Sequence, residues 1–235
     1  MMTSSGKLID VTNFKDEDVD LLDIAHALAG LHRWNAATTQ YITVESHCLF
    51  CEQILYHAVE KARGYTGYGG DLSDAEGVVW AETDVPPECM RVIDGCSCIA
   101  VSQRWEPTPR LRLLVLLHDA HEAYLGDITT PTAEQLGITQ LLKELKHSID
   151  AAIYTYLGIP FPTKIEQAAI DFIDHWAMRI EGLHFMHDSL YDDLPQFQAW
   201  EEVDFSILDS SPRGESRPGS QWYARIEELQ GICLR

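Results

Sequence analysis

The sequence predicts an all-α fold, and two observations carry that prediction. Apolar residues recur at helical spacing in almost every periodic segment, and residues that start or end helices stand at the borders of those segments. No alternation of polar and apolar residues persists, and the sequence contains no internal repeat. The 235 residues are about the size of one large domain. We therefore expect a single helical domain over residues 1–235.

The first two helices are expected over residues 21–31 and 44–63. Asp20 and Thr43 stand directly before them, and both residue types are favoured N-caps because their side chains accept hydrogen bonds from free backbone N–H groups. The second helix carries His47 on its apolar stripe. A lone histidine on such a face is usually a core residue bonded to a carbonyl, so a metal role for His47 needs further ligands nearby.

The segment 64–109 is the least regular part of the sequence. Its glycine-rich and proline-rich stretches interrupt any helical periodicity. We expect short helical turns at 73–80 and 87–101, with loop elsewhere. The segment is interpreted as an insertion into the helical domain, and a lid, an oligomer contact and a plain surface excursion all stay open for it.

Four more helices are expected in the second half of the chain. They cover residues 110–125, 139–158, 163–187 and 221–232. Gly126 is placed to end the first of these as a left-handed C-cap. Thr163 and Glu166 form a capping box at the start of the third. Residues 209–220 are rich in Ser, Pro and Gly and are expected to form a polar loop.

The net charge excludes one class of partner. The chain has 17 basic and 37 acidic residues, which gives a formal net charge of −20. Such a surface repels a phosphate backbone, so we expect no nucleic acid polymer as a partner. A small phosphorylated ligand is still compatible with this charge, because a bound metal ion and a few local Arg or Lys side chains can reverse the field inside a pocket.

Neither a membrane span nor a signal peptide is expected, since the sequence lacks a long apolar run and its first residues lack an apolar core. We therefore expect a cytoplasmic protein whose six cysteines are thiols. A zinc site made by Cys48, Cys51, Cys96 and Cys98 is disfavoured, because the first pair lies in a helical pattern and the second has an unusual spacing. Buried small apolar residues are the favoured interpretation of these cysteines.

The segment Leu113–Asp127 is the most informative part of the chain. After an apolar run it carries His118 and Asp119, then Glu122, and finally an aspartate at its end. Such residues are rarely buried unless they are paired or bound to metal, because burial of a lone charge is unfavourable. His118 and Asp119 are about 100° apart on a helix, so both side chains can converge on one ion. Glu122 lies one turn further, close enough to act on a water at that ion.

A metal site needs more ligands, and other helices offer them. His47 is one candidate. Asp171 and Asp174 stand among Ile, Phe, Ala and Trp in the helix expected over 163–187. One His, a His-Asp pair and one further Asp would give a four-ligand site of mixed nitrogen and oxygen donors. That set suits a divalent metal ion such as Zn, Co, Mn or Mg, and it is more typical of a catalytic site than of a structural one.

The order of these residues resembles the HD-domain metal-dependent phosphohydrolases. The match is closer to the branch of bacterial 5′-deoxynucleotidases and their phage relatives, which include enzymes that hydrolyse dATP to deoxyadenosine and triphosphate. It is carried by Asp23–Ala29, His32–Asn35, Val44–His47 and Leu116–Asp127. The resemblance runs from about residue 6 to 190, apart from the insertion, and it implies an HD-domain helical bundle.

Four positions match the metal ligands of that family. They are His47, His118, Asp119 and Asp174. Asp174 is preferred to Asp171 because its spacing to Glu181 and Met186 resembles that of the family.

Four further positions match residues that act on the substrate. The resemblance implies that Glu122 positions or activates the attacking water and that Asp127 lies beside the reacting phosphate. Arg33 is implied to contact the phosphate. Trp34 is implied to pack against the deoxyribose and so to exclude a 2′-hydroxyl. One departure is that the family often carries Gly-His where this chain has Ala36-Ala37.

The sequence therefore predicts a metal-dependent phosphohydrolase that attacks the phosphorus bonded to the 5′ oxygen of a 2′-deoxynucleotide. Monophosphates (a 5′-deoxynucleotidase) and triphosphates (a dNTP or dATP triphosphohydrolase) both stay open as substrates, and a homo-oligomer is expected. The alternative is a catalytically idle HD domain that binds a nucleotide and serves as an interaction module. Glu122 and Asp127 favour the enzyme, because a binding module has no need of a water-activating carboxylate.

Overall fold

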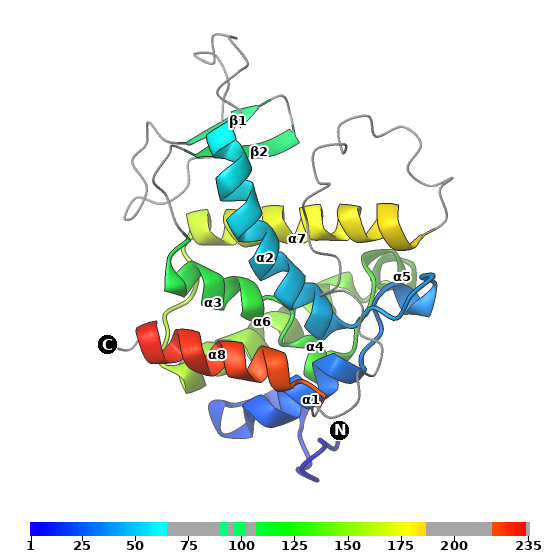
Figure 1. Ribbon diagram of the computed structural model, residues 1–235. Coiled ribbons are helices and arrows are strands. Elements are labelled where there is room, and N and C mark those ends of the chain that lie inside the picture. Colours follow the sequence, from blue (N-terminus) through cyan, green and yellow to red (C-terminus); the bar gives the residue numbers. More distant parts are fainter. Residues whose placement is uncertain (65–89, 94–95, 102–106, 187–217, 234–235) are drawn as a thin grey trace.

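The computed structural model describes residues 1–64, 90–93, 96–101, 107–186 and 218–233. These residues form an all-α fold, as the sequence predicts, with one short two-stranded sheet as the exception (Figure 1). Among the described residues, no helix combines the length and the apolar character that crossing a bilayer requires.

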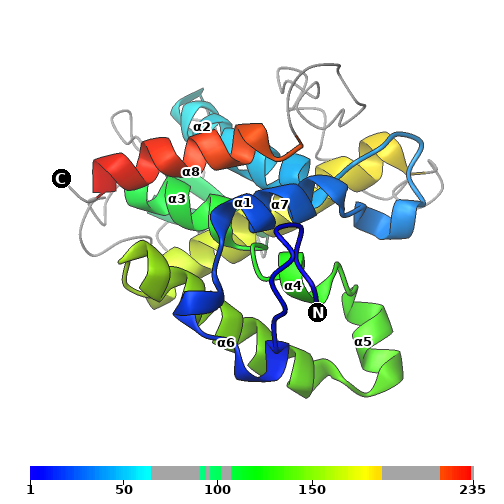
Figure 2. The same cartoon turned by 90° about the horizontal axis from the view of Figure 1, so that it is seen from below.

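The N-terminal helices begin where the sequence predicts. Helix α1 (Leu21–Gly30) follows two short 3-10 helices, and Asp20 accepts hydrogen bonds from the backbone of its first turn. Helix α2 (Val44–Gly64) follows Thr43, whose hydroxyl accepts a hydrogen bond from Ser46 N. A third 3-10 helix, η3 (Arg33–Ala36), lies between α1 and α2. The two helices at Val11–Asn13 and Asp16–Asp18 pack on α6, as Figure 2 shows.

The short helical turn expected at 87–101 is wrong, because this region forms an antiparallel hairpin. Strand β1 (Met90–Ile93) pairs with β2 (Cys96–Val101), and Met90 lies opposite Val101. The strands are rich in Val and Ile, and Asp94-Gly95 stands between them in the sequence, a dipeptide that favours tight hairpins. The helical turn expected at 73–80 lies outside the described residues.

The single helix expected over 110–125 is divided in two. Helix α3 (Pro109–Leu117) and helix α4 (Glu122–Leu125) are separated by a tight turn that contains His118 and Asp119. Hydrogen bonds from residue i to i−3, such as Glu122 N to Asp119 O, tighten the chain there. The ring of His118 also donates from Nδ1 to Val115 O, at 2.7 Å. The His-Asp pair therefore lies in a turn between helices and not within one.

Gly126 ends α4, but not as a left-handed cap. Its φ of 79° is positive and its ψ of 163° is extended, so the chain leaves the helix directly. The sequence analysis did not expect helix α5 (Thr130–Leu136). Only one of its seven side chains is buried, so the segment has no apolar stripe that would mark a helix.

The remaining helices begin and end close to the expected residues. Helix α6 (Thr139–Leu157) ends at Gly158 in the left-handed conformation, and helix α7 (Lys164–Phe185) opens with the expected Thr163–Glu166 capping box. Helix α8 (Ser220–Cys233) completes the fold. Most of the polar loop expected over 209–220 lies outside the described residues.

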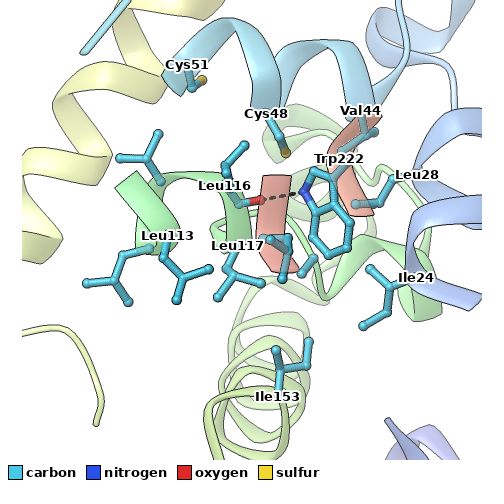
Figure 3. Packing of buried hydrophobic residues seen from close by; sticks show 14 of the residues in the cluster. Ile24, Leu28, Val44, Cys48, Cys51, Leu113, Leu116, Leu117, Ile153 and Trp222 are labelled. Carbon is cyan, nitrogen blue, oxygen red and sulfur yellow. Dashed lines mark hydrogen bonds between the residues drawn. The ribbon is translucent and has the colours of Figure 1, made fainter. Parts of the chain in front are cut away.

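One apolar core joins α1, α2, α3, α6, α7 and α8. Trp222 of α8 is fully buried in it, and Figure 3 shows its ring among Leu28, Val44 and Leu116. Its indole Nε1 donates to Leu116 O at 2.8 Å. This carbonyl belongs to the last turn of α3, two residues before His118. Helix α8 therefore supports the turn that contains the His-Asp pair.

Helix α8 lies alongside α1 and α3 (Figure 2). Three contacts fix it against the other helices. Glu45 of α2 accepts hydrogen bonds from Gly219 N and Trp222 N and so caps the first turn of α8. Gly219 lies so close to the backbone of Ala25 that a Cβ there would clash. Glu52 of α2 is bound by guanidinium groups from α3 and α8, which are Arg112 and Arg225.

Candidate functional site

Four side chains from three separate parts of the sequence converge at one point of the bundle. His47 comes from α2, His118 and Asp119 from the turn after α3, and Asp174 from α7. The two Nε2 atoms of the histidines lie 3.3 Å apart. Asp174 Oδ1 is 3.0 Å from His47 Nε2 and 3.7 Å from His118 Nε2. Asp119 Oδ2 is 3.2 Å from His118 Nε2 and 3.8 Å from His47 Nε2.

The second nitrogen of each histidine ring determines what the ring offers to this cluster. His118 Nδ1 contacts the carbonyl of Val115, and His47 Nδ1 contacts a carboxylate oxygen of Glu181 at 2.6 Å. Carbonyl and carboxylate oxygens only accept, so both Nδ1 atoms must carry the proton. In the neutral rings, both Nε2 atoms therefore present lone pairs to each other and to two carboxylate oxygens.

A cluster made only of acceptors needs a positive charge, and a divalent ion fits it. Donors 2.0–2.2 Å from an ion at tetrahedral angles lie about 3.3–3.6 Å apart. The separations of 3.0–3.8 Å between the donor atoms of the cluster bracket that range. Burial lowers the pKa of both histidines, and Arg33 also lowers that of His47. The pKa values are nevertheless raised well above the usual value, by Cys51, Glu181 and Asp174 at His47 and by Asp119, Cys48 and Asp174 at His118. The cluster can thus hold a metal ion, or protons in its place.

The two candidate aspartates of α7 have different surroundings. Asp174 contacts both histidines, as given above. Asp171 is exposed, and its Oδ1 accepts a hydrogen bond from Gln167, one turn earlier on the same helix. The structure therefore brings Asp174 to the cluster and leaves Asp171 on the surface.

Glu181 is a central residue of the site to which the sequence analysis gives no role. It is fully buried in α7 and accepts hydrogen bonds from His47 Nδ1, from Arg33 Nε at 3.0 Å and from Trp34 Nε1 at 3.1 Å. Burial raises the pKa of Glu181, but Arg33 and His47 outweigh it and hold the pKa below its usual value. The available signal was its position seven residues after Asp174, two turns along the same helix face.

Arg33 and Trp34 lie beside the cluster because the chain between α1 and α2 turns sharply. Trp34, Asn35 and Ala36 have φ values of 57°, 51° and 58°, a left-handed conformation that is unfavourable for residues with a Cβ. Both side chains are held by Glu181. The guanidinium of Arg33 also reaches Asp119, with Nη1 3.5 Å from Oδ2. The site thus combines a cluster of two histidines and two carboxylates, of which Asp174 is partly exposed, with the adjacent guanidinium of Arg33.

Glu122 is buried at the start of α4, next to Asp119. One donor atom of each of Asp119, His121 and Glu122 lies within 4.8 Å of the others. Lys146 Nζ is 3.7 Å from Glu122 Oε1, whereas Oε2 has no hydrogen-bond partner among the described residues. Burial, reinforced by the carboxylates of Asp119 and Asp127, raises the pKa of Glu122 well above its usual value. A carboxyl group of raised pKa with one free oxygen suits proton transfer near neutral pH.

Asp127 lies just beyond α4 and is half-buried. Burial raises the pKa of its carboxyl group, and Arg33 opposes this rise. Its carboxylate is close enough to Glu122 to raise the pKa of that residue. The structure therefore brings Asp127 to the same acidic region as the cluster.

Comparison with known proteins shows a relative of the chain but no family. No protein-family model matches the chain. The chain is similar to an uncharacterized protein of Rhodobacter capsulatus, with 29% identity over 182 residues, which covers 76% of this chain and 68% of that protein. The description of that protein states no activity, so the chemistry of the site is the basis for any functional assignment.

Proposed function

We propose that this protein is a metal-dependent phosphohydrolase of the HD-domain type that acts on 2′-deoxynucleotides. The observation that carries the proposal is the cluster of His47, His118, Asp119 and Asp174, in which two histidine lone pairs and two carboxylates face one another. The order of these residues in the chain is that of the ligands in the family that the sequence resembles. Arg33 and Glu122 beside the cluster add the groups that phosphate binding and proton transfer require.

Each residue then has a defined task. A divalent ion held by His47, His118, Asp119 and Asp174 would supply Lewis-acid polarisation of a phosphoryl oxygen and would make water more acidic. Glu122, through its unpaired Oε2, takes a proton from the attacking water. Arg33 binds the phosphate by charge-assisted hydrogen bonds. Asp127 lies beside the reacting phosphate, and Trp34, fixed through its indole N–H by Glu181, packs against the sugar.

The deciding experiment is a screen of mono- and triphosphates, ribo and deoxy, with added Mn²⁺, Co²⁺ or Zn²⁺ and separation of the products by chromatography. We expect release of phosphate or triphosphate together with a deoxynucleoside. Nucleotide binding without turnover under every metal would contradict the proposal and indicate an idle binding module instead.

Glu122→Ala provides the test of the chemistry. We expect turnover to fall by about 100-fold or more, the scale of a positioned acid-base group, while the metal content stays unchanged. Metal content is read by elemental analysis of the same sample. An unchanged rate would remove Glu122 from the mechanism.

Trp34→Ala tests the selectivity for the sugar. We expect the preference for deoxy over ribo substrates to narrow, because the indole that clashes with a 2′-hydroxyl is gone. Arg33→Ala is the matched variant, and it should weaken both kinds of substrate alike, since phosphate is common to them. If Trp34→Ala slowed both sugars equally, the indole would have only a structural role.

A further inference from the structure

Lys146 of α6 is a second cation, after Arg33, beside the carboxylates of the candidate site. Its Nζ lies 3.7 Å from Oε1 of Glu122, and the exposed fractions of the two side chains are 29% and 6%. Burial raises the pKa of Asp127, and Lys146, like Arg33, is close enough to oppose that rise. An ion pair that is mostly shielded from water is screened less than one on the surface, so this contact can hold the Glu122 side chain in place.

The two carboxyl oxygens of Glu122 have different surroundings. Oε1 faces Lys146, whereas Oε2 is buried and has no hydrogen-bond partner among the described residues. The last torsion of a glutamate side chain is broad and two-fold, so a carboxyl group without a partner rotates easily about it. The ammonium group on one side makes the two oxygens inequivalent and leaves Oε2 available to a water.

A second contact from α6 holds the residue that precedes Glu122. His121 is buried, and its Nδ1 donates to Oδ1 of Asp150 at 3.0 Å. Lys146 and Asp150 are four residues apart on α6, so they lie on the same face of that helix. This face therefore holds both the first residues of α4 and the carboxyl group of Glu122.

We propose that Lys146 is a positioning residue for Glu122, and that by pairing with Oε1 it leaves Oε2 turned toward the attacking water. The inference rests on the proposed function, in which Glu122 takes a proton from that water. A lysine beside such a site could instead bind the phosphate of the substrate. The geometry favours positioning, because the ammonium group already faces Glu122 and most of the lysine side chain is buried.

Lys146→Met is the main variant, because it removes the charge and keeps most of the apolar stem. The substrates are the 2′-deoxynucleoside mono- and triphosphates, with Mn²⁺ added. We expect kcat to fall by about 10-fold, a part of the factor of 10² to 10⁴ that a positioned acid-base group contributes, with KM and metal content unchanged. Lys146→Arg should restore most of the rate, since a guanidinium group can pair with the same oxygen. Lys143→Met, at an exposed position of the same helix, is the control and should behave as the wild type.

A second comparison separates positioning of Glu122 from binding of phosphate. In a Glu122→Ala background no carboxyl group is left to be positioned, so adding Lys146→Met should change kcat by less than about 2-fold. A lysine that binds phosphate would instead raise KM or slow the reaction in both backgrounds.

Two outcomes would overturn the inference while the wild type remains an active phosphohydrolase. One is an unchanged kcat in Lys146→Met, and the other is an equal loss of rate from Lys146→Met with and without Glu122. A wild type that turns over none of these substrates would overturn the proposed function, and the role of Lys146 with it.

Discussion

At the scale of single residues, the buried carboxylate of Glu181 holds three side chains of the candidate site in place. Glu181 holds His47, Arg33 and Trp34 at once, so it fixes the ring that faces the cluster and both groups proposed to contact the substrate. A carboxylate behind a histidine ligand sets its tautomer and increases its basicity. We therefore expect Glu181 to be a positioning residue that couples the proposed metal site to the proposed substrate contacts.

Glu181→Gln should weaken metal binding by about 10- to 100-fold, the usual effect of changing such a supporting group. The amide has one oxygen in place of two, so it cannot accept from three N–H donors as the carboxylate does. Metal affinity is measured by competition with a chromogenic chelator. Asp171→Asn, on the exposed side of the same helix, is the control and should bind metal as the wild type does. Equal affinity of both variants would contradict the role of Glu181.

At the scale of elements, the left-handed turn Trp34–Ala36 is the least favourable local structure described. The left-handed conformation is unfavourable by about 1–2 kcal/mol for each residue with a Cβ. Glycine adopts it freely, and the family that the sequence resembles often carries glycine at the position of Ala36. The turn persists because Glu181 binds the side chains at its start and Ala37 N donates to Trp34 O.

Ala36→Gly should therefore increase the free energy of unfolding by about 0.5–1 kcal/mol, since relief of the strain exceeds the entropy that glycine adds to the unfolded chain. Ala37 offers a matched control because its φ is −85°. Ala37→Gly relieves no strain and should lower stability. Chemical denaturation of both variants tests this, and a loss of stability in Ala36→Gly would count against the strained turn.

The sequence predicts those elements whose signals are local. Asp20, Thr43 and Thr163 cap helices as expected, because capping depends only on the next three residues. The break after Leu117 could not be predicted, since it is stabilised by Trp222, a residue about a hundred positions away. The pairing of strands 90–93 and 96–101 had a signal in the Asp94-Gly95 dipeptide that stands between β-branched residues in the sequence, although a helical turn was expected there.

For the candidate site, too, local patterns could be predicted and long-range contacts could not. The residue types and their order suggested which side chains would converge, and the structure brings Asp174 and not Asp171 to the cluster. Glu181 had a signal in its position two turns after Asp174 on the same face of α7. Its contacts with His47, Arg33 and Trp34 depend on how η3, α2 and α7 pack together, so the sequence alone could not predict them.

At the scale of the whole molecule, four arginines of this acidic chain join elements that lie far apart in the sequence. Arg112 and Arg225 connect α3 and α8 to α2 through Glu52, and Arg110 at the start of α3 binds Glu166 of α7. Arg33 joins η3 to α7 in the same way. Helix α8 is the last element so joined, and through Trp222 it reaches the turn of the candidate site.

Trp222→Phe tests this long-range support. Phenylalanine fills most of the space but cannot donate to Leu116 O, so a buried carbonyl loses its partner and stability should fall by about 1–3 kcal/mol. Tyr223→Phe is the control, because the hydroxyl it removes bonds to Glu227 at an exposed position. Denaturant unfolding measures both variants. If Trp222→Phe were as stable as the wild type, the bond from α8 would not support the turn.

Trp222 follows all four residues of the candidate centre in the sequence, and this order has a consequence for biosynthesis. Translation proceeds from the N-terminus, so His47, His118, Asp119 and Asp174 all leave the ribosome before the indole that supports their turn. We expect the nascent chain to present these donors without their final geometry, and the centre to reach it only when α8 emerges and docks. Ion capture during synthesis would therefore involve a looser set of ligands than capture by the finished protein.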